Sequence, residues 1–390
     1  MNVVAPVVPD LDALIAGFSA TAAQRDRTGG HAATEKAQIR QAGLLAWPVP
    51  AEQGGAGKGW PEILRLVRRI ATADGSLAHL YGYHALQVGT IRLYANPEQA
   101  ERLLGATARE HLWWGNANNP LDARLVAEDA ADGGFVLDGR KGFASGARGS
   151  RHLNVSALHQ ASGQLILVTV PTDAPGVTVR GDWDAVGQRQ TDSGTVEFEQ
   201  VRIPARDVLR RPGEAPRLHI TLRTTLSQLV LVNLFLGHGL GALAAARDHS
   251  LRETRPWGGA GVASIAEDPF VLARHGELRL ALRAAELATD AANDALEWGW
   301  ELGAAITPEQ RGGVALRAAE ARVLAQRAAL KAGEELFELT GARAARAELN
   351  FDRFWRNIRT HSLHDPVDYK LRDIGRHSLT GAVPEPGFYA

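Results

Sequence analysis

The segment RTHSLHDP, close to the end of the sequence, combines two histidines with an acid: His361, His364 and Asp365. Positions three apart in a helix lie on one face, so the two imidazoles could act at one site. Such a group could bind a metal ion, or it could transfer protons near neutral pH. The spacing matches no common zinc pattern and the sequence indicates no third ligand, so we expect no metal here. The residues alone leave open both proton transfer and the plain end of a surface helix.

Four further positions carry side chains that could bind or react. His79 and Tyr83, in GSLAHLYGYHALQ, are four apart and would share one face of a helix, although core aromatic packing gives the same pattern. Asn116 follows two tryptophans in WWGNANNP, and Ser145 lies in a glycine-containing turn, GRKGFASGA. A serine at the edge of a loop usually bonds only the backbone. Each of these signals is weak when taken alone.

Composition excludes several kinds of protein. The chain carries 43 Lys+Arg and 44 Asp+Glu, a formal net charge of −1, which argues against nucleic acid or an anionic membrane as the main partner. The absence of cysteine excludes disulfides, thiolate metal sites and a cysteine nucleophile. With 45% hydrophobic and 22% charged residues, an ordinary globular protein with a buried core is expected.

Two segments bear on cellular location. The first ten residues, MNVVAPVVPD, contain two prolines and no basic residue, which does not fit a signal peptide. Residues 224–246 are uncharged and long enough to span a bilayer, but they include Asn233, His238 and three glycines, which is too polar for a helix facing lipid. We therefore expect no membrane span and a cytoplasmic protein.

Three regions with different patterns of apolar residues indicate the helices and strands that position these side chains. Apolar residues recur every three to four positions in residues 1–110, which predicts a helical domain. Residues 111–212 contain short β-like runs separated by Gly, Asp and Pro, which predicts an antiparallel sandwich or barrel. Long helices return in residues 213–390, with expected limits of 216–254, 268–303, 308–341 and 349–364. The sequence therefore predicts an α+β fold, mostly α, ending in a four-helix bundle whose outer apolar stripes are buried in an oligomer.

One pattern points to a different fold. Gly237, Gly239 and Ala242 match the G-x-G-x-x-A spacing of a dinucleotide-binding turn. The flanking segments are predicted helices, however, and no strand with an acidic end follows about twenty residues later. We therefore interpret these small residues as positions where helices pack closely.

Taken together, the order of the three regions resembles the acyl-CoA dehydrogenase superfamily over essentially the whole chain. Three motifs carry this resemblance: GLLAWPVPAEQGGAG, GFVLDGRKGFASGA and GQRQTDSGTVEFEQVRIP. Within the superfamily the chain is similar to the flavin-dependent monooxygenase branch typified by dibenzothiophene monooxygenase. The motifs behind that second resemblance are HLYGYH, WWGNANNP, TRPW with EDPF, RNIRTHSLHDPVDYKLRDIG and PEPGFYA.

Three departures from the dehydrogenase pattern favour the monooxygenase branch. Dehydrogenases of this superfamily abstract a substrate proton with a glutamate, whereas this sequence has Asp365-Pro366 there, and residues 215–247 hold no acid that could replace it. NANNPLDARLVA stands in place of the flavin motif Thr-Glu-Pro-x-x-Gly-Ser. Phe337 stands where a glutamine helps to hold the adenosine half of FAD, and its side chain forms no hydrogen bond. The resemblance therefore implies FMN, with FAD as the alternative.

The resemblance implies a two-component monooxygenase that takes reduced FMN from a separate flavin reductase. Reduced flavin would react with O2 to give a C4a-hydroperoxyflavin, which oxygenates a small sulfur- or nitrogen-containing organic compound. His364 would donate or relay a proton beside this species. The full set of implied catalytic and flavin-facing residues is His364, Tyr83, His361, His79, Asn116 and Ser145.

Three further residues are implied to hold the cofactor. Arg255, in TRPW, would bind the flavin phosphate from a neighbouring subunit of a homotetramer, with Arg343, in TGAR, as its partner. Trp113 would line an apolar pocket beside the cofactor, although core packing explains it as well. Two alternatives stay open: an FAD-dependent acyl-CoA dehydrogenase that uses Asp365 or an unidentified base, and a helical scaffold without catalytic activity.

Overall fold

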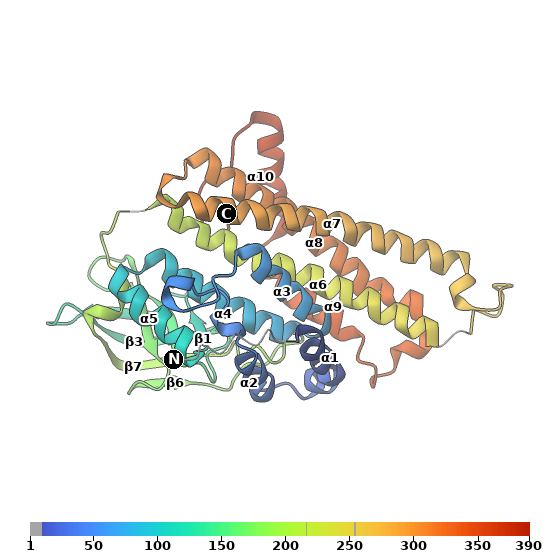
Figure 1. Cartoon of the computed structure of the whole chain (residues 1–390), viewed down its shortest axis with the longest axis horizontal. Coiled ribbons are helices and arrows are strands. Elements are labelled where there is room, and N and C mark those ends of the chain that lie inside the picture. The colour runs from blue at the N-terminus through green and yellow to red at the C-terminus, as the bar shows by residue number, and fades with distance from the viewer. Residues whose placement is uncertain (1–9, 216, 253–254) are drawn as a thin grey trace, which may run out of the picture.

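The computed structural model describes residues 10–215, 217–252 and 255–390. The segment considered as a signal peptide lies outside these residues except for Asp10, and so do the two limits of the predicted helix 216–254. Figure 1 shows helices at the N-terminal end, a sheet beside them, and long C-terminal helices that extend away from the sheet. The predicted fold class is confirmed.

The N-terminal part is helical, as predicted. It consists of α1 (Leu11–Thr28), α2 (Ala33–Gln41), α3 (Trp60–Ala73), α4 (Gly75–Tyr94) and α5 (Pro97–Glu110), with 3₁₀ turns at Leu44–Ala46 and Ala51–Gln53. Helix α4 begins after Asp74, whose side chain accepts a hydrogen bond from the Leu77 N–H at 2.9 Å and so caps the first turn. Helix α5 begins with a reciprocal capping box between Asn96 and Gln99. Almost every side chain of α4 is buried, so this helix is the centre of the N-terminal part.

The middle of the chain forms one curled sheet of eight strands among the described residues. The strands are β1 (Trp114–Ala117), β2 (Leu125–Asp129), β3 (Phe135–Lys141), β4 (His152–His159), β5 (Leu165–Pro171), β6 (Val177–Val179), β7 (Val196–Ile203) and β8 (Val208–Arg210). They pair in the order β6-β7-β3-β2-β4-β5-β8, and β1 pairs in parallel with β4, which places Asn116 beside Asn154. This pairing leaves the β1 end of the sheet against α4.

The C-terminal part consists of long helices packed side by side (Figure 1). They are α6 (Leu222–Arg252), α7 (Pro269–Leu302), α8 (Pro308–Thr340), α9 (Asp352–Ser362) and α10 (Val367–Thr380). Helices α6 and α8 run in the same direction, because Arg311 near the start of α8 bonds Thr221 at 2.8 Å and Ser250 near the end of α6 bonds the Leu339 carbonyl at 3.0 Å. Helix α10 lies beyond the predicted limit of 364 and is an addition to the predicted set.

The N-terminal and C-terminal helices share one hydrophobic core, while the sheet has its own. The shared core reaches from Phe18 in α1 to Ile358 in α9, and the second core is built from strands β1 to β8. The division into 1–110, 111–212 and 213–390 therefore stays a prediction, since the outer two parts are packed as a single unit.

Helix α6 is the central helix of the shared core. Its apolar window is long enough to cross a membrane, yet 83% of it is buried inside the protein, as in a core helix. A Cβ atom on Gly237 would lie 2.4 Å from the Arg68 carbonyl oxygen of α3, and one on Gly239 would lie 3.0 Å from the Ala329 backbone of α8. These glycines therefore allow close helix packing, which confirms that interpretation over a dinucleotide-binding turn.

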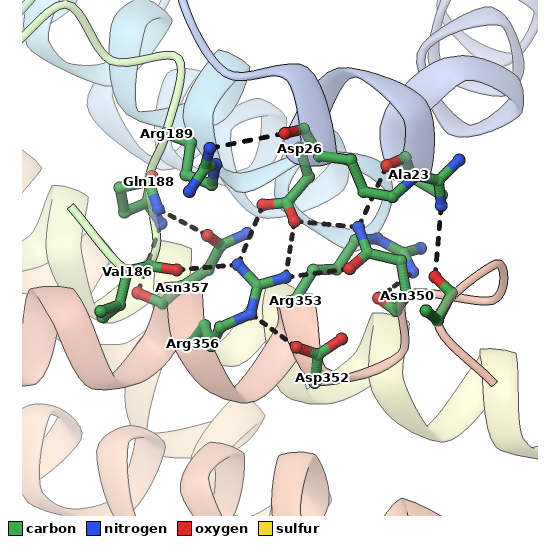
Figure 2. A network of polar contacts seen from close by, with 12 residues as sticks. Ala23, Asp26, Val186, Gln188, Arg189, Asn350, Asp352, Arg353, Arg356 and Asn357 are labelled. Carbon is green, nitrogen blue, oxygen red and sulfur yellow. Dashed lines mark hydrogen bonds and ion pairs between the residues drawn. The ribbon is translucent and has the colours of Figure 1, made fainter. Parts of the chain in front are cut away.

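A polar network anchors α9 to the rest of the molecule (Figure 2). Arg356 of α9 pairs with Asp26 of α1 at 2.6 Å and donates to the Val186 carbonyl of the loop after β6 at 2.8 Å. In the same loop the Gln188 N–H donates to the Asn357 side chain at 2.6 Å. These bonds tie α9, which carries His361, to the N-terminal helices and to the sheet region together.

Candidate active site

Three stacked rings lie where α4 meets α9. The His79 ring stacks on Tyr83, one turn later in α4, with centroids 4.0 Å apart, and on His361 of α9, with centroids 4.6 Å apart. All three side chains are buried. The structure therefore brings together three of the predicted site residues from opposite ends of the chain.

Burial keeps the two stacked imidazoles neutral. It lowers the pKa of His79 to about 3, and it is the main reason that the pKa of His361 lies well below its ordinary value. Both ring nitrogens of His79 and Nδ1 of His361 are buried without a hydrogen-bond partner among the described residues. An unsatisfied buried polar atom costs about 1–3 kcal/mol, so these nitrogens fit a site where a bound molecule completes the hydrogen bonding.

His364 lies just beyond α9 and does not continue the helical face of His361, contrary to the spacing argument. Helix α9 ends at Ser362, so His364 belongs to the turn before α10. Its Nδ1 lies 3.1 Å from Asp365 Oδ1, and its ring meets the Tyr389 ring edge-on with centroids 5.5 Å apart. Its side chain is 34% exposed, so His364, unlike His361, is accessible to a ligand.

Asp365 is buried among cations. Its Oδ1 accepts a hydrogen bond from Arg322 Nη2 at 3.3 Å, and its Oδ2 lies 3.6 Å from Lys370 Nζ. Burial alone would raise the pKa of this carboxyl, but the hydrogen bond from His364 and the charges of Arg322 and Lys370 outweigh it and hold the pKa at about 2. A carboxylate held in its ionised form by two cations is a weak base, which is the wrong property for abstracting a carbon-bound proton.

The face of α4 that carries His79 and Tyr83 continues to Gln87. Gln87 Nε2 donates to Asn116 Oδ1 at 3.1 Å, and Gln87 Oε1 accepts from Asn154 Nδ2 at 3.1 Å. Gln87 was not identified from the sequence, although its four-residue spacing from Tyr83 predicts the shared face. Through Gln87, α4 connects the stacked rings to the polar edge of the sheet.

Asn116 and Ser145 are neighbours in this polar edge. The Asn116 N–H donates to the Ser145 carbonyl at 2.9 Å, and the Asn116 side-chain oxygen also accepts from the Asn118 N–H at 3.2 Å. Ser145 Oγ lies 2.8 Å from Ser193 Oγ, so its side chain bonds another side chain and not only backbone. The predicted pair is therefore adjacent and buried.

An open cavity of about 450 Å³ lies between the sheet, the start of α6 and the C-terminal segment. Its wall includes Asn118, two positions after Asn116, and Phe388, which precedes Tyr389. The cavity wall therefore contains sequence neighbours of predicted site residues, but no predicted site residue itself lines it.

Tyr83 lies close enough to a residue of the cavity wall and to the Asp365 cluster for the charges of both to act on its phenol. Burial raises the pKa of its phenol to about 12, and the charges of Arg223, Arg322 and Asp365 also act on it. Arg223 lines the cavity, whereas Arg322 is bonded to Asp365. A protonated phenol can donate a hydrogen bond to a bound molecule.

The remaining predicted cofactor residues lie elsewhere. Trp113 is buried, where its Nε1 donates to the Lys36 carbonyl at 3.2 Å and its ring meets His84 edge-on, so in this chain it packs between α2 and α4. Arg255 follows the end of α6 and Arg343 follows the end of α8. Since those helices are parallel, the two arginines lie at the same end of the bundle. Their roles in binding a cofactor stay predictions.

The described residues contain no group of three His, Asp or Glu side chains placed to hold a metal ion. They contain neutral rings, amide groups and hydroxyl groups where α4 meets α9 and the sheet, beside an ionised carboxylate paired with cations. This set suits an organic cofactor with polar ring atoms better than a cation.

The order of the domains is helical, then a curled sheet, then a helical bundle, and a polar site lies at their junction. This arrangement defines the class of acyl-CoA dehydrogenase-like proteins. The chain belongs to the acyl-CoA dehydrogenase family: residues 16–111 match its N-terminal domain, 119–201 its middle domain and 229–369 its C-terminal domain.

Within the family the chain is similar to monooxygenases. It is 42% identical to the dibenzothiophene monooxygenase of Rhodococcus qingshengii over 95% of this chain and 92% of the relative. It is 41% identical to a probable FMNH2-dependent monooxygenase of Pseudomonas putida over 96% of this chain and 94% of the relative. Its structure matches that of a methanesulfinate monooxygenase from Pseudomonas fluorescens with a TM-score of 0.95 and 40% identity, covering 98% of this chain and all of the other.

Proposed function

We propose that this protein is a monooxygenase that uses reduced FMN and O2 to oxygenate a small sulfur- or nitrogen-containing organic compound. The observation that carries the proposal is the state of Asp365. It occupies the position of the dehydrogenase base, yet Arg322 and Lys370 hold it ionised with a pKa of about 2. The FMNH2 dependence in the name of the Pseudomonas putida relative supports the choice of cofactor.

The stacked rings and the polar edge of the sheet carry groups that fit a flavin. Ser145 and Asn116 offer a hydroxyl and an amide to the polar edge of the ring system, while the unpartnered nitrogens of His79 and His361 offer further hydrogen bonds. Arg255 and Arg343, at one end of the bundle, would bind the flavin phosphate of a neighbouring subunit. When bound, reduced FMN would supply activated oxygen from O2, in the form of a C4a-hydroperoxyflavin.

The side chains of the protein would deliver protons and exclude water. His364 is accessible and hydrogen-bonded to Asp365, so it can deliver a proton at Nε2 while Asp365 orients the ring and stabilises its positive charge. Tyr83 stays protonated, so its phenol can donate a hydrogen bond to a bound ligand. The buried stack of His79 and His361 closes the other side of Tyr83 against water.

The alternative, an FAD-dependent dehydrogenase, is disfavoured by the same site. Asp365 lies 3.3 Å from a guanidinium and 3.1 Å from an imidazole, so a proton transferred to it would break two interactions. Helix α6 offers no substitute, since residues 215–247 contain no acidic side chain.

The outer face of α7 supports assembly into a homotetramer. Leu272, Leu280, Leu287 and Trp298 are between 45% and 72% exposed. At 3.6 residues per turn these four positions lie within an arc of about 80°, which makes one apolar stripe. A second copy of this chain would cover the stripe. The protein would act in the cytoplasm with a separate flavin reductase as its supplier of reduced FMN.

The proposal is tested by mixing the protein anaerobically with reduced FMN and following flavin absorbance after O2 is added. The expected result is reoxidation in two phases, with a protein-dependent transient between them that is absent with free reduced FMN. Reoxidation in one rapid phase, together with tightly retained FAD and a long-wavelength band on adding an acyl-CoA, would establish the dehydrogenase alternative.

A further inference from the structure

Three hydroxyl groups form a hydrogen-bonded chain that begins at Ser145. Ser145 Oγ lies 2.8 Å from Ser193 Oγ, and Ser193 Oγ lies 2.8 Å from Thr191 Oγ1. The chain ends at the Gln188 carbonyl, in the loop between β6 and β7, which accepts from Thr191 Oγ1 at 3.0 Å. All four residues are buried, so these hydrogen bonds are shielded from bulk water.

The carbonyl at the end of the chain fixes the direction of every hydrogen bond in it. A carbonyl oxygen can only accept, and each hydroxyl group has one proton to donate. Because Thr191 donates to Gln188, its Oγ1 must accept from Ser193, and Ser193 Oγ must then accept from Ser145. The second acceptor near Ser193 Oγ, the Thr191 carbonyl at 3.5 Å, gives the same direction. Ser145 Oγ is therefore left with lone pairs and can accept a hydrogen bond from a ligand, but it has no free proton to donate.

The Gln188 carbonyl is held in place by a backbone that is unusual for a residue with a side chain. Gln188 has a φ of 55°, in the left-handed region that favours glycine, and Asp192 in the same loop has a φ of 48°. The Gln188 N–H donates to the Asn357 side chain of α9 at 2.6 Å (Figure 2), and its carbonyl also accepts from Trp183 Nε1 at 2.8 Å. Strained residues of this kind persist where the surrounding structure fixes them, commonly at functional sites.

Reduced and oxidised flavin differ in the hydrogen bond that they offer to such an acceptor. Reduced flavin carries a proton on the ring nitrogen N5, whereas oxidised flavin has only a lone pair there. A hydroxyl group that can only accept therefore pairs with the reduced N5–H. Against oxidised N5 it would place one lone pair beside another and leave two buried polar atoms without a partner.

We propose that Thr191 and Ser193 are positioning residues that make this protein bind reduced FMN in preference to oxidised FMN. They direct the Ser145 proton away from the ligand, so that Ser145 Oγ accepts from N5–H. This inference rests on the proposed function, in which Ser145 lies beside the flavin ring system. The protein would take up FMN in its reduced form and give it back oxidised, so this difference in affinity favours exchange in the required direction.

The test compares the affinities of the full-length protein for the two states of FMN. Oxidised and photoreduced FMN are titrated anaerobically and binding is followed by tryptophan fluorescence. We expect reduced FMN to bind at least about tenfold more tightly. Ser193→Ala removes the acceptor of the Ser145 proton, which can then turn to oxidised N5, so the ratio of the two dissociation constants should fall about tenfold. The midpoint potential of bound FMN should fall with it, by about 30 mV for a two-electron couple.

Thr191→Val keeps the size of the side chain and removes the last hydroxyl group of the chain. It should shift the ratio in the same direction but less, because Ser193 keeps the Thr191 carbonyl as an acceptor. The matched control is Thr289→Val in α7, which also removes a buried hydroxyl that donates to a backbone carbonyl, that of Ala285 at 2.6 Å. A merely structural defect weakens both states of FMN alike, so the control should leave the ratio unchanged. Equal affinity of the original protein for both states, or an unchanged ratio in Ser193→Ala, would overturn the inference.

Reoxidation kinetics separate this inference from the proposed function. Reoxidation of reduced FMN in two phases, together with equal affinity for the two states of FMN, would overturn the inference and leave the monooxygenase standing. A preference for reduced FMN that is lost in Ser193→Ala, together with reoxidation in one rapid phase, would uphold the role of the hydroxyl chain and overturn the monooxygenase.

Discussion

The imidazole of His361 stacks on that of His79: the ring centroids are 4.6 Å apart and the angle between the ring planes is 23°. The two residues are far apart in the sequence. Two protonated rings could not stack at this distance inside a protein without a counter-ion. Burial holds both rings neutral, so their nitrogens can donate and accept hydrogen bonds toward a ligand. This relationship leads to the first prediction.

His79→Phe should reduce the loss of stability on acidification. The folded pKa of His79, about 3, is below its unfolded value near 6.5, so its contribution is fully present above pH 6.5 and is lost as pH falls toward 3. Between pH 6.5 and 5 the original protein should lose about 2 kcal/mol through this group, and His79→Phe should not. Urea unfolding at the two pH values measures the difference; equal losses would contradict the neutral state of His79.

Asp365→Asn should destabilise the protein at neutral pH, by about 3 kcal/mol, because it leaves Arg322 and Lys370 buried without their shared carboxylate. The pKa of Asp365 is lowered to about 2, so the stabilisation from its charge is present above pH 4 and is lost as pH falls from about 4 to 2. The difference between the two proteins should shrink over that range. Asp173→Asn, at a surface pair whose aspartate is 65% exposed, is the control and should change little.

His364→Gln should lower product formation about 10²-fold or more while the protein still reoxidises reduced FMN and releases H2O2. The reason is that His364 is the accessible imidazole next to Asp365, placed to deliver a proton. Product and H2O2 are measured in the same reaction, with His377→Gln, on the exposed end of α10, as the control. Product formation at the original rate would rule out the catalytic role of His364.

Gln87→Leu should weaken binding of reduced FMN by about tenfold, because Asn116 and Asn154 each lose a side-chain partner from α4. Anaerobic fluorescence titration gives the affinity. Thr107→Val is a suitable comparison, since it also removes a buried hydrogen bond, to the Trp114 indole at 2.8 Å, in another part of the N-terminal helices. If the two variants lose equal affinity, the effect of Gln87→Leu is one of general stability.

Leu280→Arg should dissociate the assembly. The leucine is 72% exposed in the middle of the apolar stripe on α7, and an arginine there would place a charge in the contact between copies. Light scattering after size-exclusion chromatography gives the mass. Leu379→Arg makes the same change at an 87% exposed leucine on α10 and should leave the mass unaltered. A tetramer in the Leu280→Arg protein would place the interface elsewhere.

The order of helices and strands could be predicted from the sequence. Helical periodicity, short β-like runs and the glycines of α6 are local patterns, and the structure has helices, sheet and helices in that order. The limits of α7 and α8 agree within two residues with the predicted 268–303 and 308–341. Helix α10 was missed, because the predicted set ended in the turn at His364 and Asp365.

Only part of the candidate site could be predicted from the sequence. Spacing places His79 and Tyr83 on one face of α4, and the same rule extended by one turn would have found Gln87. It fails for His361 and His364, because α9 ends between them and sends the two rings into different surroundings. Trp113 illustrates a further limit: its residue type suits a pocket or a core, and in this chain its indole bonds the Lys36 carbonyl.

By itself the sequence determined the fold class, the resemblance to the monooxygenase branch and the absence of a glutamate base, since these depend on residue identity and local spacing. Only the tertiary structure decided that His361 meets His79, that Asp365 is held ionised by Arg322 and Lys370, and that Arg223 faces a cavity. The physical reason is that burial and charge set the protonation of each group, and both are produced by residues far away in the chain.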